Sequence, residues 1–228
     1  MAKIKICGLS RKEDISYVNE AKPDYCGFII NFPKSRRNVT PDQVRALVRE
    51  LNQDICPIGV FVNQPMEEIL SLAVDGTLGA VQLHGSETQE YVRELKKRLS
   101  EIQEQHSEGI TEKQIERCNE RRLPVIQAFQ IAETEDVRRA AASEADFILL
   151  DKGTGSGQTF DWNLVQEIGR PFFLAGGLGP ENLAEAIVRL KPYAVDMSSK
   201  VETDGIKDGK KIAEAVRIVR AVPNGSVF

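Results

Sequence analysis

Short apolar runs alternate with amphipathic segments along the whole chain, and this alternation constrains the fold more than any other feature. Eight runs have the brevity and composition of strands covered on both faces. They lie at residues 4–7, 25–30, 57–62, 79–83, 124–129, 147–150, 172–175 and 193–197. The amphipathic segments begin near Lys12, Pro41, Pro65, Thr88, Glu133, Asp161, Pro180 and Lys207. Such alternation predicts an α/β fold of parallel βαβ units, closed into a single-domain (β/α)8 barrel, or TIM barrel, over residues 1–228.

A doubly wound open sheet is the competing architecture. Its dinucleotide-binding form carries GxGxxG after the first strand, and no such motif follows residues 4–7 here. The 228 residues suit one large domain, because eight units then have about 28 residues each, near the compact end for the barrel. The closed barrel is therefore the preferred interpretation.

One stretch, near residues 100–121, interrupts the regular spacing. It is polar, with Gly109 as a helix stop and a capping-box spacing from Thr111 to Gln114 that predicts a further helix. Since it joins a helix to the next strand, it belongs at the N-terminal face of a barrel, away from the chemistry. We expect a solvated helical insertion; a contact between subunits is less favoured because apolar residues are few.

Charge and hydropathy exclude several kinds of partner. The net charge of −4 and the dispersed Lys and Arg residues argue against a nucleic-acid partner. No stretch is long and apolar enough to span a bilayer, and the start of the chain lacks the apolar segment of a signal peptide, so we expect no membrane contact and a cytoplasmic protein. The four cysteines are scattered without metal-ligand spacing, and no metal is expected.

Polar and small residues gather where the predicted strands end. The apolar run at 147–150 ends on Asp151, a glycine-rich loop follows at 153–157, and Asp161 is placed to cap the next helix. Taken alone, this stretch is equally well an ordinary connection between a strand and a helix. The other strand ends supply Cys7, residues 31–37, Asn63, Gln82, His84, Gln127, Gly176, Gly177, Asp196, Ser198 and Ser199. In a barrel these ends meet at one mouth, where catalysis takes place.

Seven motifs then resemble the phosphoribosylanthranilate isomerase family, in the family's order and over nearly the whole chain. They are KICGL at 5–9, GFIINFPKSRRNV at 27–39, GVFVN at 59–63, VQLHGSE at 81–87, LLDKGTGSGQTFDW at 149–162, LAGGLGPENL at 174–183 and AVDMSS at 194–199. The resemblance implies a cofactor-free isomerase of tryptophan biosynthesis. Its reaction is the Amadori rearrangement of N-(5-phosphoribosyl)anthranilate to 1-(2-carboxyphenylamino)-1-deoxyribulose 5-phosphate. Its partner is a small phosphorylated substrate, bound by a monomer or homodimer.

The resemblance also implies catalytic roles for Cys7 and Asp151. Opening the ribose ring requires an acid at the ring oxygen, which is Asp151, and the Schiff base that follows requires a base at the neighbouring carbon, which is Cys7. A free thiol is only roughly 3% ionised at pH 7, so Cys7 needs a nearby cation. Lys5 shares its side of the strand and could supply that cation or simply lie deeper. Without the resemblance, Cys7 reads as a small core residue.

The two anionic groups of such a substrate need two binding sites. By resemblance, Arg37 binds the anthranilate carboxylate, and its neighbour Arg36 could be confused with it. His84 is expected to orient the substrate or to hydrogen-bond within its own loop. The phosphate is assigned to the loops after the seventh and eighth strands, with the glycine-rich loop closing over it. The residues in question are Gly155, Gly157, Gly176, Gly177, Ser198 and Ser199.

Several alternatives stay open. Cys7, His84 and Asp151 could together hold a metal, a weak hypothesis since their spacing is dispersed. A related barrel of the indole-glycerol-phosphate synthase type needs a catalytic lysine at a strand end, and none was expected at these ends. An inactive barrel kept as a scaffold is disfavoured by the retained Cys7 and Asp151. Finally, Lys200 stands where the family usually has glycine, so its ammonium either attracts phosphate or points to solvent.

Overall fold

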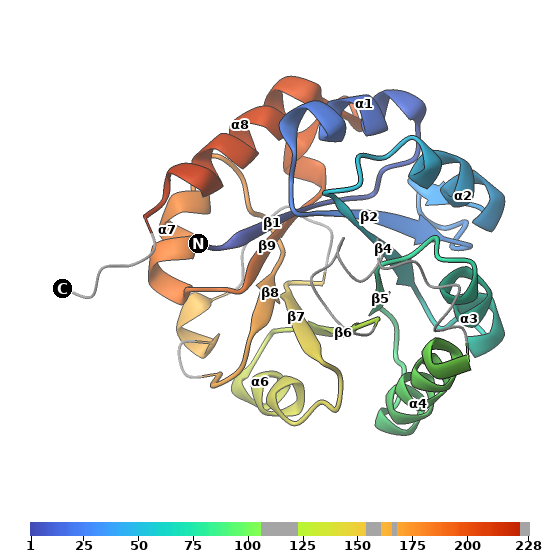
Figure 1. The fold of residues 1–228 in the computed structure, drawn as a ribbon. Coiled ribbons are helices and arrows are strands. Elements are labelled where there is room, and N and C mark those ends of the chain that lie inside the picture. The colour runs from blue at the N-terminus through green and yellow to red at the C-terminus, as the bar shows by residue number, and fades with distance from the viewer. Residues whose placement is uncertain (106–122, 154–160, 166–167, 224–228) are drawn as a thin grey trace.

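Eight parallel strands close into a barrel with helices around it (Figure 1). The structure is a computed structural model that describes residues 1–105, 123–153, 161–165 and 168–223. Its barrel strands are β1 (Lys3–Cys7), β2 (Tyr25–Ile30), β4 (Cys56–Phe61), β5 (Ala80–Leu83), β6 (Val125–Gln130), β7 (Phe147–Asp151), β8 (Phe172–Leu174) and β9 (Ala194–Met197). Strand β1 pairs with both β2 and β9, and this double pairing closes the barrel. The predicted (β/α)8 fold is confirmed, and each predicted strand end lies within one residue of the observed one.

The helices lie outside the strands. They are α1 (Lys12–Ala21), α2 (Pro41–Arg49), α3 (Met66–Val74), α4 (Gln89–Gln105), α6 (Thr134–Ala141), α7 (Leu183–Leu190) and α8 (Gly209–Ala221). Helix α2 shows why these helices begin where the sequence indicates. Pro41 occupies its first turn, where no amide hydrogen is needed, and the side chains of Thr40 and Gln43 cap each other's backbone amides.

One predicted helical segment is a 3₁₀ helix in the structure, and another is largely untested. After β7, the described residues contain a 3₁₀ helix, η1 (Trp162–Val165), where the sequence predicts a helix that begins at Asp161. Asp161 does cap it, since its carboxylate accepts the amide of Asn163 at 2.9 Å. Residues 100–105 of the expected insertion form the end of α4, and residues 106–122 lie outside the described part of the chain. The position of the insertion therefore stays a prediction.

Side chains inside the barrel form layers, because alternate residues of a strand point to opposite faces. On β1, Lys3 lies at the bottom, Lys5 in the middle and Cys7 at the mouth. The bottom layer is aromatic, with Tyr25, Phe147, Phe173 and Tyr193 packed against one another at ring separations of 4.6–5.8 Å. The ammonium of Lys3 donates to the hydroxyls of Tyr25 and Tyr193 at 3.0 and 2.9 Å. These aromatic side chains thus fill the bottom of the barrel.

Three short strands lie at the mouth and were not predicted. Strand β3 (Asn38–Val39) extends the sheet beside β2. Strands β10 (Glu202–Thr203) and β11 (Ile206–Lys207) form a hairpin between β9 and α8. Asp204 and Gly205 turn this hairpin with φ values of +52° and +79°, which is the conformation that an Asp-Gly pair favours in tight hairpins. The hairpin places two charged residues, Glu202 and Lys207, directly opposite each other.

Candidate active site

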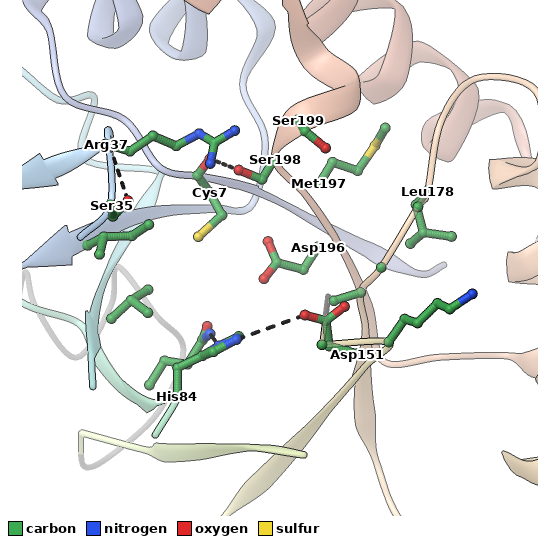
Figure 2. Close-up of a pocket in the computed structure, with 18 of the residues that line it drawn as sticks. Cys7, Ser35, Arg37, His84, Asp151, Leu178, Asp196, Met197, Ser198 and Ser199 are labelled. Carbon is green, nitrogen blue, oxygen red and sulfur yellow. Dashed lines mark hydrogen bonds and ion pairs between the residues drawn. The ribbon is translucent and has the colours of Figure 1, made fainter. Parts of the chain in front are cut away.

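A cavity of about 570 Å³ opens at the C-terminal ends of the strands, as expected for catalysis in this fold. Eight of the ten predicted site residues line it: Cys7, Arg37, His84, Asp151, Gly176, Gly177, Ser198 and Ser199. Figure 2 shows the side chains of Cys7, His84, Asp151 and Asp196 directed into the same space. Gly155 and Gly157 lie outside the described residues, so their contact with a phosphate stays a prediction.

Cys7 ends β1 with only 8% of its surface exposed. Gly27, its partner in the neighbouring strand, leaves the space that Cys7 and Lys5 occupy together. A Cβ atom at Gly27 would lie 2.8 Å from Cys7 Sγ and 3.2 Å from Lys5 Nζ, so both groups are close to the same point. Burial raises the pKa of the Cys7 thiol, and the Lys5 ammonium opposes this only in part. In the free protein the thiol form is therefore favoured.

Lys5 is fully buried, one layer below Cys7. Its ammonium donates to Asp196 Oδ2 at 2.7 Å and to Gln82 Oε1 at 2.8 Å. Although burial opposes it, Asp196 and Cys7 raise the pKa of Lys5, so the ammonium keeps its charge. The sequence left open whether Lys5 assists Cys7 or lies deeper; the structure places Lys5 deeper, with its ammonium close enough to oppose the effect of burial on the thiol. Asp196 Oδ1 is buried and has no hydrogen-bond partner among the described residues.

Burial lowers the pKa of His84 and favours the neutral ring, and the contact with Lys5 determines its tautomer. Lysine can only donate, so the Gln82 atom that it reaches is the carbonyl oxygen and the other terminal atom is the amide nitrogen. That nitrogen lies 2.8 Å from His84 Nδ1 and donates to it. The neutral ring then carries its hydrogen on Nε2, which lies 3.9 Å from Asp151 Oδ2. His84 thus presents a donor toward Asp151, a role that sequence reasoning did not assign.

Asp151 ends β7 on a different side of the cavity from Cys7, and its side chain is 23% exposed. Gly176, which follows β8, allows this carboxylate its position. A Cβ atom at Gly176 would lie 2.6 Å from Asp151 Oδ1, and the residue has a φ of +83°. The sequence assigned Gly176 to the phosphate; in the structure it also makes room for the predicted acid.

Ser198 and Ser199 follow β9 at the same rim as Gly177. The hydroxyl of Ser198 donates to the carbonyl of Cys7 at 3.1 Å, which ties this loop to β1 (Figure 2). Lys200 lines the cavity as well, and its ammonium pairs with Glu181 at 3.1 Å. Lys200 does not have a positive φ, so the replacement of the family's glycine causes no backbone strain here.

Arg37 and Arg36 both line the cavity, but their surroundings differ. The aliphatic part of Arg37 crosses directly over Gly8, where a Cβ atom would lie 2.3 Å from Arg37 Cδ. Its guanidinium donates twice to Glu202, and the side chain is 20% exposed. Arg36 makes one contact with the same carboxylate and is 59% exposed. The less exposed arginine, which has two contacts with Glu202, is the one that the resemblance assigned to a carboxylate.

The metal hypothesis is not supported by the geometry. Among the residues that the structure describes, no three His, Cys, Asp or Glu side chains are close enough together to hold a metal ion, and this includes Cys7, His84 and Asp151. The expectation that no strand end carries a lysine is wrong. Lys152 directly follows β7 and lines the cavity, so that expectation does not exclude a related barrel enzyme.

Comparison with known proteins decides between such enzymes. The sequence profile of N-(5'-phosphoribosyl)anthranilate isomerase matches residues 4–120 and 106–217. A protein of that name from Endomicrobium trichonymphae is 41% identical, over 97% of this chain and 100% of the relative. The chain belongs to the phosphoribosylanthranilate isomerase family. The resemblance noted in the sequence is thereby confirmed.

Solved members of the family have the same fold. One is a phosphoribosylanthranilate isomerase in complex with reduced 1-(o-carboxyphenylamino)-1-deoxyribulose 5-phosphate, with a TM-score of 0.77 and 34% identity over 96% of this chain and 99% of that one. Another is a monomeric form of the dimeric isomerase from Thermotoga maritima. Its TM-score is 0.76, with 33% identity over 97% of this chain and 100% of that one. Within the described part of this chain, no helix has the length and apolar character needed to cross a membrane.

Proposed function

We propose that this chain catalyses the Amadori rearrangement of N-(5'-phosphoribosyl)anthranilate in tryptophan biosynthesis, with Asp151 as general acid and Cys7 as general base. The observation that carries the proposal is that these two residues face one cavity, with an arginine at one rim and the Gly177 and Ser198 loops at another. The ligand of a solved relative, a reduced form of the reaction product, contains a carboxylate, which an arginine can bind, and a phosphate, which backbone amides of loops can bind.

The first step opens the sugar ring. The carboxyl group of Asp151 gives its proton to the ring oxygen as the C1–O bond breaks, and the anthranilate nitrogen forms an iminium with C1. The Nε2–H of His84 points toward Asp151 from 3.9 Å and stabilises the carboxylate that remains. Gly176, which has no Cβ atom, leaves the room that the Asp151 carboxylate occupies.

In the second step, the thiolate of Cys7 removes the proton from C2 of the iminium. The electrons of the C–H bond form an enolamine, which becomes the ketone of the product after proton transfer to C1. Burial disfavours this thiolate in the free protein. The positive iminium stabilises it once the substrate is bound, and Lys5 contributes a permanent positive charge beside it. The Cys7 thiolate is therefore favoured only when the iminium, whose C2–H bond it attacks, is bound.

The protein holds the substrate at its two ends, by the carboxylate and by the phosphate. The guanidinium of Arg37 binds the anthranilate carboxylate in a fork, and the backbone amides at Gly177, Ser198 and Ser199 bind the phosphate. Gly155 and Gly157 are proposed to complete the phosphate site. These contacts keep the reacting carbon atoms between Cys7 and Asp151, which is the main contribution that remote binding makes to catalysis.

Turnover of the Cys7→Ser and Asp151→Asn variants tests the proposal. Each variant should lower kcat at least about 100-fold, since a general acid or base typically contributes 10²–10⁴-fold, and neither should rescue a tryptophan auxotroph that lacks this isomerase. Cys26→Ser is the matched control, because Cys26 is buried in the core outside the cavity and should keep the wild-type kcat. More than about a tenth of wild-type turnover in Cys7→Ser would show that Cys7 is not the base.

The assembly and location of the protein belong to the same proposal. A dimeric relative from Thermotoga maritima supports a homodimer, with a monomer as the alternative. The described residues that line the cavity all belong to one chain, so we expect activity per chain not to depend on protein concentration. We propose a cytoplasmic location, as expected for a biosynthetic enzyme.

A further inference from the structure

Glu202, in the hairpin beside the cavity, receives three cationic side chains on one carboxylate. Its side chain is only 3% exposed. Arg37 reaches it through Nε at 2.6 Å and Nη2 at 2.8 Å, Lys207 reaches it at 2.7 Å, and Arg36 reaches it at 2.6 Å. Sequence reasoning gave this glutamate no role. A buried carboxylate with this many charged partners fixes the geometry of the groups around it.

The contact with Glu202 uses only one edge of the Arg37 guanidinium. The group is planar and has two edges able to grip a carboxylate, one formed by Nε with Nη2 and one by Nη1 with Nη2. Glu202 occupies the first edge. Nη1 has no hydrogen-bond acceptor among the described residues, so the second edge stays available to a ligand in the cavity that Arg37 lines.

Glu202 is itself held in place by Lys207. The hairpin register sets the two residues opposite each other, and the Lys207 side chain is 2% exposed. The same ammonium donates to the carbonyl of Ser198 at 2.9 Å. One buried lysine therefore connects the carboxylate behind Arg37 with the loop proposed for the phosphate.

We infer that Glu202 is a positioning residue. It holds the guanidinium of Arg37 by the edge formed by Nε and Nη2, so that the edge formed by Nη1 and Nη2 meets the substrate carboxylate. The inference rests on the proposed function, because it concerns the same carboxylate site. Arg36 is not equivalent, since its single contact leaves its planar group free to turn. Glu202 touches no reacting atom and acts only through Arg37.

A simpler role for Glu202 predicts the opposite result. If it only neutralises three cations, its removal leaves more positive charge at the rim, and anionic ligands should bind more tightly. If it positions Arg37, its removal lets the guanidinium turn, and a carboxylate ligand should bind more weakly. The sign of the change in affinity separates the two roles.

The experiment measures competitive inhibition of the wild-type chain and of Glu202→Gln by anthranilate and by inorganic phosphate, together with KM and kcat. We expect the inhibition constant for anthranilate and the KM to rise at least about tenfold, with a much smaller change for phosphate and for kcat. Glu144→Gln is the matched control. Glu144 grips Arg93 through the same two nitrogen atoms, but on an exposed surface away from the cavity, and its removal should change none of these values.

A second variant covers the case in which Glu202→Gln does not fold. Glu202→Gln with Lys207→Met removes one cation together with the anion, and it should also weaken anthranilate inhibition. Unchanged or tighter anthranilate inhibition in the folded variant overturns the inference while the proposed function stands. A wild-type chain without isomerase turnover overturns both.

Arg37→Lys should lose the same affinity for anthranilate. Glu202→Gln should then cause little further loss in that background, because a lysine has no planar guanidinium for Glu202 to orient.

Discussion

Replacement of Lys5 by methionine tests how the charges beneath the cavity are balanced. The Lys5→Met side chain fills a similar volume but removes the ammonium from Asp196 and Gln82. Asp196 is then a carboxylate that is 9% exposed and has neither oxygen paired, since its Oδ1 already lacks a partner among the described residues. The variant therefore separates a buried pair and leaves one charge without compensation.

The size of the effect follows from burial. Removal of one partner from a buried ion pair costs about 3–5 kcal/mol of stability. Lys3→Met is the matched control, on the same strand and the same inward face. The hydroxyls of Tyr25 and Tyr193, which Lys3 contacts, lie 2.9 Å apart and still hydrogen-bond each other after its removal. No charge is left unpaired, so we expect a cost of only about 1–2 kcal/mol.

Urea unfolding at pH 7 measures both variants. Trp162 is the only tryptophan of the chain and is buried, so its fluorescence reports the loss of the folded barrel. The double variant Lys5→Met with Asp196→Asn should recover part of the stability, because it no longer buries a lone charge. If Lys5→Met costs no more than Lys3→Met, the ion pair contributes nothing specific and the reasoning is refuted.

The other predictions concern the rim of the cavity and the acid–base chemistry. Arg37→Ala should raise KM at least about tenfold with a small effect on kcat, whereas Arg36→Ala should change KM less than about threefold. Equal effects at the two positions would refute the assignment of Arg37 to the substrate carboxylate. Although burial opposes it, hydrogen bonds from Arg37 and Lys207 lower the pKa of Glu202 from 4.5 to about 2. About 3 kcal/mol of stability should therefore be present above pH 4.5 and lost as the pH falls toward 2, and Glu202→Gln should abolish this part of the acid unfolding curve. Lys200→Met should change stability by less than about 1 kcal/mol in thermal unfolding, because its pair with Glu181 is exposed; a larger loss would give that pair a structural role. Isomerase activity should survive dialysis against EDTA, since side chains perform every proposed proton transfer, and a strict requirement for a divalent ion would contradict the mechanism.

The barrel could be predicted because each strand is an apolar run of the right length, and parallel strands buried on both faces need no longer-range information. The mouth followed from topology, since parallel strands place their carboxyl ends together. The hairpin was missed although its Asp204-Gly205 pair is a recognised turn signal. The strands on either side have only two residues each and show no apolar alternation.

The buried polar network could not be read from the sequence. Lys5, Gln82 and Asp196 lie on three strands far apart in the chain, and no local pattern reports that their side chains meet. The role of Gly27 was hidden for the same reason, because the groups that need its space come from β1. By contrast, the choice of Arg37 over Arg36 depended on the family resemblance, since two neighbouring arginines in one loop cannot be distinguished by residue type.

The contacts that complete the cavity join the two ends of the chain, and this has a consequence for folding kinetics. The Lys5–Asp196 pair and the Ser198–Cys7 hydrogen bond each span 191 residues, and Arg37 and Glu202 are 165 apart. Contacts of such long sequence separation form late, since most of the chain must first be ordered between them. Upon dilution from denaturant, helical circular dichroism should therefore return before turnover does. A partly folded chain that lacks the β1–β9 seam would contain most of the barrel and no active site.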